Sequence, residues 1–212
     1  MTTSYETNRD SLLAAALPHV PFEGWTEITW RRAVTDTGID ATVARAICPR
    51  GALDLVVAFH ARGDAEMTAW LRTADLSDTR LRGRIAAAVR KRLELVEADK
   101  EAVRRGTTLL VLPQNADTGV RMLWDTADSI WSALGDASDD INWYTKRLTL
   151  SGVYASTMLF WLGDDSAKHR ATWEFLDRRI EDVMRFEKAK SHVNDNKALR
   201  WLLTGPLWAL GK

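Results

Sequence analysis

The chain has 212 residues, 46% of them hydrophobic, so it can fold as one domain around a single core, with at most a small helical appendage. Its formal net charge is zero, which removes any global argument for nucleic-acid binding. The lone cysteine, Cys48, excludes an internal disulfide and suits a reducing compartment, and the four histidines have no metal-ligand spacing.

Helix signals follow one another along the whole chain, whereas alternating strand patterns are weak everywhere. We therefore predict an all-α fold of about ten helices, with Gly38 as a turn and Asp40 as a helix cap. A long charged helix is expected to carry Ile85, Val89, Leu93 and Val96 on one apolar face. The expected helices cover residues 10–17, 25–37, 40–47, 51–60, 64–74, 77–105, 117–134, 140–162 and 166–190, followed by a last helix capped by Asp195.

Three regions are expected: a helix-turn-helix-like head (1–76), a helical body (77–190), and a linker with a carboxyl-terminal segment (191–212). The lengths of the head helices are typical of TetR-type repressors. Residues 1–80 nevertheless hold 8 Lys/Arg against 11 Asp/Glu, and the second helix of the motif offers only Arg45 to read bases. Because DNA binders neutralise several phosphates, nucleic acid is not an expected partner. A TetR-type lipid-sensing repressor is the alternative.

Catalysis is not indicated. The pairs Asp139-Asp140 and Asp164-Asp165 each precede a predicted helix, where carboxylates cap free amides. No glycine-rich phosphate loop is found either. We predict a protein with no catalytic residue, no metal site and no cofactor.

The 148–163 run holds no charged residue and mixes small with large side chains. Such a helix can wall an apolar cavity, because ligand pockets are mostly apolar with few polar groups. Trp124 on the preceding helix would pack beside it. The alternative is that these side chains simply fill one tight core, which would make the protein a structural partner module.

An aromatic and basic cluster, 142–147, precedes that run. Trp143 and Arg147 are four residues apart, so the guanidinium can lie over the indole. Exposed Trp, Tyr and Arg are typical of interface hot spots. Alternatively, Trp143 is buried under the head and Arg147 pairs with an acidic residue of 139–140.

The carboxyl-terminal stretch 201–211 is uncharged as well. Its leucines share one face of a helix, and the tryptophans fall opposite, as a membrane-interface segment could use. Gly205-Pro206 interrupts this helix. Docking onto the core or onto a second copy is the alternative. The predicted membrane-binding residues are Leu199, Leu202, Leu203, Leu207, Trp208 and Leu210.

The runs 139–154 and 173–180, with 22–26 at the amino terminus, resemble the ubiquinone-biosynthesis accessory lipid-binding family (coenzyme Q protein nine). The resemblance covers nearly the whole chain. It implies a TetR-like fold without DNA binding, an isoprenoid, quinone intermediate or phospholipid in the body, and a carboxyl-terminal amphipathic helix on a membrane. It also implies a non-enzymatic role: presenting lipid intermediates to the di-iron demethoxyubiquinone hydroxylase.

Residue by residue, the resemblance assigns a lipid-binding set and a hydroxylase-facing set. A homodimer is expected. No import sequence precedes the first helix, so we expect a bacterial protein in the cytoplasm, peripheral to the inner face of the membrane. The lipid-binding set is Leu148, Gly152, Tyr154, Met158 and Trp161, with Trp124. The hydroxylase-facing set is Asn142, Trp143, Tyr144, Lys146 and Arg147.

Overall fold

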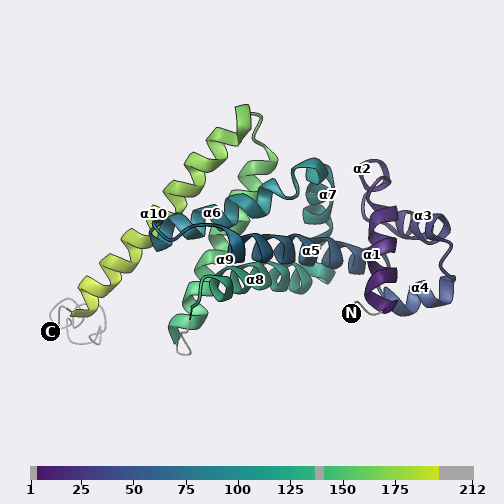
Figure 1. Cartoon of the computed structure of the whole chain (residues 1–212), viewed down its shortest axis with the longest axis horizontal. Coiled ribbons are helices and arrows are strands. Elements are labelled where there is room, and N and C mark those ends of the chain that lie inside the picture. The colour runs from purple at the N-terminus through teal and green to yellow at the C-terminus, as the bar shows by residue number, and fades with distance from the viewer. Residues whose placement is uncertain (1–3, 137–140, 196–212) are drawn as a thin grey trace, which may run out of the picture.

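The computed structural model describes residues 4–136 and 141–195, and all regular structure within them is helical, which confirms the predicted class. Three single-turn 3₁₀ segments separate some of the ten α-helices (Figure 1). The helices are α1 (Ser4–Ala16), α2 (Val20–Glu23), α3 (Glu27–Thr37), α4 (Ala41–Ile47), α5 (Ala52–Thr73), α6 (Leu81–Glu94), α7 (Lys100–Leu110), α8 (Ala116–Ala133), α9 (Ile141–Leu162) and α10 (Arg170–Asp195).

Helices α1–α4 form a head at one end of the molecule (Figure 1). The Thr26 hydroxyl caps α3, and Gly38 ends it in the left-handed conformation with φ +65°. Asp40 then caps α4 by accepting hydrogen bonds from the amides of Thr42 and Val43 at 2.9 and 3.2 Å. The turn at Gly38 and the cap at Asp40 are as predicted, because both depend only on neighbouring residues.

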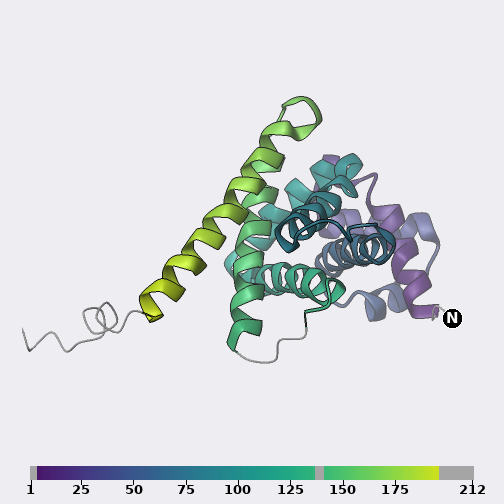
Figure 2. The same cartoon turned by 60° about the vertical axis from the view of Figure 1, so that its left-hand side comes forward.

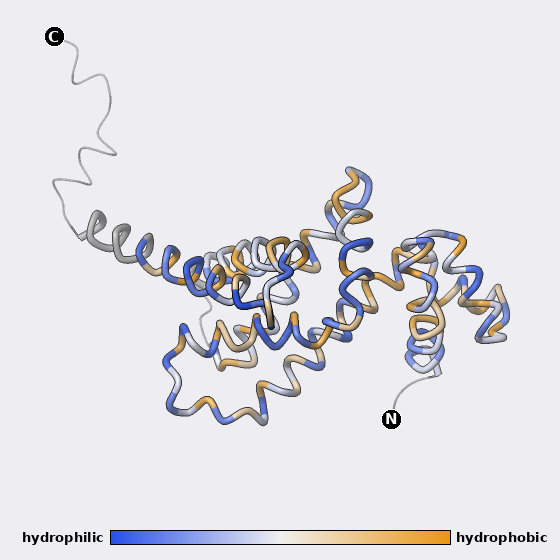
Figure 3. The backbone as a smooth tube through the Cα atoms, turned by 90° about the horizontal axis from the view of Figure 1, so that it is seen from above, coloured by the Kyte–Doolittle hydropathy of each residue, from blue (hydrophilic) through white to orange (hydrophobic). Residues whose placement is uncertain are grey.

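Helix α5 runs from the head into the body and packs against both α1 and α8. Helix α8 in turn packs on α9, and α10 lies across α9 and contacts α6. Figure 2 shows α9 and α10 side by side, with the far end of α10 projecting away from the other helices. Figure 3 shows hydrophilic and hydrophobic residues alternating along the helices, as amphipathic packing requires.

Three predicted helix boundaries are wrong. The first helix begins at Ser4, so Asp10 lies inside it and does not cap it. The expected break between 60 and 64 is absent, and α5 continues through that region. Gly63 lies within α5 and gives room to the side chain of Arg92. Only Gly, with no Cβ, leaves that room.

The predicted long helix 77–105 is two helices, α6 and α7, separated by a turn at 95–99. Val96 leaves helical geometry there, with φ −112° and ψ +14°. The expected apolar face is present, because Val89, Leu93 and Val96 are buried. The turn brings α7 back against α2 and α8. Trp25, just after α2, donates from its Nε1 to the carbonyl of Ala102 in α7 at 2.9 Å.

Candidate functional site

A cavity of about 400 Å³ lies between α5, α6, α7, α8 and α9. Its walls are almost entirely apolar, and its volume falls in the range of small-molecule sites, roughly 300–1,000 Å³. Helix α9 does line a cavity, as its uncharged sequence predicted. Its lining side chains are Tyr154, Ala155, Met158 and Leu159.

Two of the six predicted lipid-binding residues, Tyr154 and Met158, line this cavity. The other four do not line it. Leu148 is 68% exposed on the outer side of α9, and the position of a Gly152 Cβ would meet nothing within 4 Å. The α9 residues that face the core, such as Leu150 and Val153, are buried and apolar. Because the exposed Leu148 is apolar too, α9 is apolar on its outer face as well as on its inner one.

Trp161 and Trp124 are also outside the cavity. Trp161 is fully buried in the core, with its Nε1 donating to Glu97 Oε2 at 3.3 Å. Trp124 packs against Trp143 and Tyr144, at ring-centroid distances of 5.6 and 6.2 Å. A uniformly apolar helix gives no periodic signal for its inner face, and so sequence could not assign these side chains.

Most of the cavity wall was missed by sequence reasoning. These residues come from α5, α6, α7 and α8, including the helix pair that was expected to be a single helix. No local motif marks this surface. The missed residues include Phe59, His60, Arg92, Val111, Val120 and Met122.

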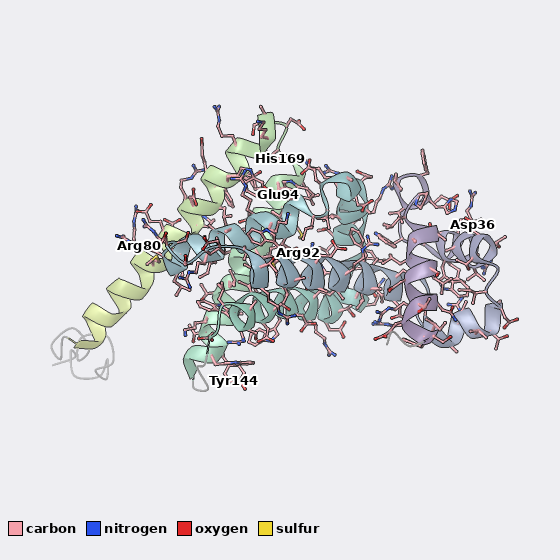
Figure 4. The ribbon with its side chains drawn as sticks, in the orientation of Figure 1. Asp36, Arg80, Arg92, Glu94, Tyr144 and His169 are labelled. Carbon is pink, nitrogen blue, oxygen red and sulfur yellow. The ribbon has the colours of Figure 1, made fainter. Side chains whose placement is uncertain are left out.

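One end of the cavity is polar. Arg92 is only 2% exposed, and its Nε donates to Asp64 Oδ1 at 2.6 Å. Its Nη2 donates to the carbonyl of His60 at 3.0 Å. Thr126 completes the group, because its hydroxyl lies 2.7 Å from His60 Nε2 and 3.0 Å from Asp64 Oδ1. Figure 4 labels Arg92 near the middle of the body.

Burial sets the protonation of this group. Burial, the largest effect, lowers the pKa of His60 to about 4; the nearby Asp64 carboxylate opposes that shift and the Arg92 guanidinium adds to it. Burial likewise raises the pKa of Tyr154. At neutral pH, therefore, His60 and Tyr154 are uncharged, and the ion pair of Arg92 with Asp64 carries no net charge.

The aromatic and basic cluster forms a second feature at the amino-terminal end of α9. Tyr144 is 60% exposed and meets Trp143 edge-on at 4.8 Å. Arg147 lies over the Trp143 ring, 4.0 Å from its centroid, as the four-residue spacing predicted. In Figure 4, Tyr144 lies at the end of the body, far from Arg92.

Arg147 and Lys146 face the acidic residues of α8 and its end. Arg147 is only 2% exposed, so it is not the surface residue that the cluster suggested. Its Nε donates to Asp128 at 2.5 Å and its Nη1 to Asp136 at 3.1 Å, and these are not the acidic partners considered from sequence. Lys146 Nζ also donates to Asp136, at 2.7 Å. Arg147 is therefore held by two carboxylates while its guanidinium packs on the ring of Trp143.

Several predicted site residues have no described side chain. Asn142 lies in α9, but its side chain is outside the described residues. The predicted membrane-binding residues (199–210) and the Gly205-Pro206 interruption are also outside them. Among the helices of the described segments, none is both long and apolar enough to cross a bilayer. Within the same segments, no group of three His, Cys, Asp or Glu residues could hold a metal ion.

The fold defines the class of protein first. The chain is similar to a TetR transcriptional regulator from Nitrosomonas europaea, with a TM-score of 0.66 over 82% of this chain and 95% of that one. At 20% sequence identity this likeness concerns the fold alone. The protein therefore has a TetR-like, all-α fold, as predicted.

Sequence comparisons find a second likeness. Residues 116–187 match the COQ9 family model. The chain is 31% identical to the ubiquinone biosynthesis protein COQ9, mitochondrial, of Rattus norvegicus, over 85% of this chain and 60% of that protein. It is 32% identical to the Drosophila melanogaster protein of the same name, over 87% and 58%. The chain is thus similar to the COQ9 proteins, as the sequence resemblance indicated, and spans about 60% of their length.

Proposed function

We propose that the protein is a non-enzymatic accessory factor of ubiquinone biosynthesis that binds an isoprenoid lipid or quinone intermediate in the cavity beside α9. The apolar cavity between α5 and α9 is the observation that carries this proposal. The relatives that the chain matches are named ubiquinone biosynthesis proteins, which supports the pathway.

The physical basis is the hydrophobic effect. A polyprenyl-quinone intermediate does not leave a bilayer unaided, because each methylene moved into water costs about 0.8 kcal/mol. A protein that covers part of the chain at the membrane surface lowers the cost of moving the head group to an active site.

Lipid extraction of the purified protein, followed by mass spectrometry, tests the binding. We expect stoichiometric isoprenoid or phospholipid from the natural sequence and none from Ala155→Trp, which fills the cavity from its α9 wall. A matched change outside the cavity, Gly152→Trp, should keep the lipid, because its Cβ would point into open space. Lipid-free protein in all three samples would refute the proposed cargo and favour a structural partner module.

We further propose that the hydroxylase acting on demethoxyubiquinone binds the surface around Tyr144. The exposed Tyr144 packs against Trp124 and Trp143, which supports this proposal. The guanidinium of Arg147 packs on the Trp143 ring. Rigid aromatic clusters of this kind supply much of the binding energy in protein interfaces. Asn142 and Lys146 would flank the contact.

Pull-down of the hydroxylase tests this surface. Tyr144→Ala should weaken capture by at least tenfold, a typical hot-spot effect of about 1.4 kcal/mol or more. Phe22→Ala removes an even more exposed aromatic ring from the head and should have no effect. Equal capture by both variants would exclude Tyr144 from the interface.

For the carboxyl-terminal segment we propose reversible membrane contact through the leucines of 199–210. The support is the uncharged apolar sequence, which suits an interfacial segment. Leu203→Asp with Leu207→Asp should abolish co-flotation with phosphatidylcholine–phosphatidylglycerol liposomes. Leu81→Asp, a charge added at an exposed leucine of α6, should not. Flotation that survives the double change would remove this segment from the membrane role.

The alternative is a TetR-type lipid-sensing repressor, which the shared fold favours. Opposing it, Arg45 of α4 donates to Glu27 at 2.5 Å and lies over the Trp30 ring at 3.6 Å, so it is already engaged. A repressor would be a symmetric dimer with salt-dependent operator affinity. Selection of bound sequences from random-sequence DNA, repeated at two salt concentrations, distinguishes the two functions.

A further inference from the structure

The turn that connects α7 with α8 exposes apolar side chains. Residues 107–116 include no charged residue. Within this stretch, Val111 is 69% exposed and Leu112 is 40% exposed, and Pro113 and Gln114 are exposed beside them. Turns usually carry Gly, Pro, Asn, Asp or Ser. A turn that presents valine and leucine to the outside indicates a surface that contacts something apolar.

The same turn borders the mouth of the cavity. Val111 lines the cavity together with Val120 of α8 and Leu159 of α9, which are 67% and 56% exposed. Lining residues as exposed as these lie where the cavity opens to the surface. Phe160, next to Leu159, is partly exposed and stacks on the ring of Phe175 at 4.6 Å. The apolar lining therefore continues onto the outer surface at the mouth.

The flank of this surface on α7 is positively charged. Arg104 and Arg105 both pair with Glu101, at 3.1 and 2.9 Å, so two guanidinium groups share one carboxylate. Arg104 also donates to the carbonyl of the last residue of α9 at 2.6 Å, which holds its charge between α7 and α9. On α8, the exposed Asp117 and Arg121 carry opposite charges. The uncharged turn thus has a net positive neighbourhood.

The residue types at the mouth favour a lipid surface over a protein partner. In protein interfaces the binding energy comes mainly from Trp, Tyr and Arg, whereas Leu and Val are under-represented. Interfacial membrane segments combine apolar side chains with Lys or Arg at the level of anionic head groups. The mouth has this second composition, because its four well-exposed apolar side chains are all aliphatic: Val111, Leu112, Val120 and Leu159.

We propose that the α7–α8 turn, with Val120 and Leu159, enters the surface of an anionic bilayer, so that the cavity opens directly into the lipid. The inference rests on the proposed lipid-binding function. It adds a second membrane contact to the one proposed for the carboxyl-terminal segment, and two contacts fix the orientation of the protein on the membrane. A lipid then passes between bilayer and cavity without crossing water, which is the unfavourable step for an apolar chain.

A fluorophore at the turn tests the contact in the full-length protein. Val111→Cys is labelled with the environment-sensitive dye NBD in a Cys48→Ala background, which removes the buried native thiol. On phosphatidylcholine–phosphatidylglycerol vesicles with doxyl-labelled acyl chains, we expect the emission to shift to the blue and to be quenched. The control is Ile28→Cys, because Ile28 is an apolar residue of the head that is 59% exposed; its label should remain in water.

A second experiment measures uptake of lipid through the mouth. The protein is mixed with vesicles that contain ubiquinone and recovered at successive times, and its bound ubiquinone is quantified by mass spectrometry. Val111→Asp with Val120→Asp should slow uptake roughly tenfold or more, because a carboxylate enters a bilayer far less readily than a valine. Ile28→Asp should not slow it. Loading of all these proteins from detergent micelles should be equal, which shows that the cavity is intact.

The outcomes separate this inference from the function on which it rests. If the natural sequence takes up no lipid from vesicles or from micelles, the proposed cavity function fails. If it takes up lipid while the label at 111 stays in water, or if the double variant loads from vesicles at the natural rate, the membrane contact of the turn is overturned. A label that becomes shielded only as the protein concentration rises would assign the turn to a second copy. Equal quenching by vesicles without phosphatidylglycerol would overturn the preference for anionic lipid.

Discussion

The guanidinium of Arg92 on α6 and the carboxylate of Asp64 on α5 form an ion pair, with 2.6 Å between Nε and Oδ1. The two side chains are 2% and 9% exposed, so neither charge is hydrated to any large extent. The pair connects two helices at the polar end of the cavity, which Arg92 also lines. It therefore links the stability of the body to the chemistry of the site.

Removing one partner of this pair should strongly destabilise the fold. Arg92→Met leaves Asp64 buried without its counter-charge, which we expect to lower the free energy of unfolding by about 3–5 kcal/mol. Arg90→Met is the matched control, because Arg90 pairs with Glu94 at the surface and such pairs contribute about 0–1 kcal/mol. Urea unfolding monitored by tryptophan fluorescence measures both. Similar midpoints for the two variants would contradict the role of the buried pair.

The room that Gly63 leaves for Arg92 can be tested with a single methyl group. A Cβ at position 63 would lie 2.5 Å from Arg92 Cζ, so Gly63→Ala must displace the guanidinium. We expect a loss of about 1–3 kcal/mol from overpacking. Gly152→Ala, where the Cβ has open space, should instead stabilise α9 by about 0.5–1 kcal/mol. Thermal unfolding shows whether each variant is more or less stable than the natural sequence. Stabilisation by both alanines would disprove the steric argument.

The buried position of Arg147 separates structural from partner-binding effects in the aromatic cluster. Arg147→Met leaves Asp128 and Asp136 without this partner, and we expect a loss of about 2–3 kcal/mol in the free energy of unfolding. Tyr144→Ala, at an exposed position, should change it by less than about 0.5 kcal/mol. Chemical denaturation of the two variants decides this. An unaffected Arg147→Met protein would mean that its ion pairs contribute little.

The low pKa of His60 predicts that the fold begins to lose stability at a pH above the range in which carboxylates titrate. In the unfolded chain this histidine binds a proton below pH about 6.5, whereas in the fold it stays neutral down to about 4. Stability should therefore fall by roughly 2–3 kcal/mol as the pH drops from 6.5 to 4. His60→Gln should remove most of this slope. Urea midpoints measured across the interval test the prediction, and parallel pH profiles would refute it.

Local signals in the sequence determined the class of fold and many helix ends. The left-handed turn at Gly38 and the cap at Asp40 depend on residues only a few positions away, so they could be read directly. The four-residue spacing of Trp143 and Arg147 likewise gave their cation–π contact. The runs at 139–154 and 173–180 carried the family resemblance, which the comparisons confirm.

The tertiary structure alone decided what lines the cavity and which charges are buried. Arg92 meets Asp64 across 28 positions of sequence, and Arg147 meets Asp128 across 19. The turn at Val96 is likewise set by packing, since the apolar period of α6 would have allowed the helix to continue. The outer face of α9 is as apolar as its inner face, so only the neighbouring helices place Tyr154 in the cavity and Gly152 outside it. Sequence patterns report contacts within a turn or two of helix, whereas this site is built from helices that meet only after the chain has folded.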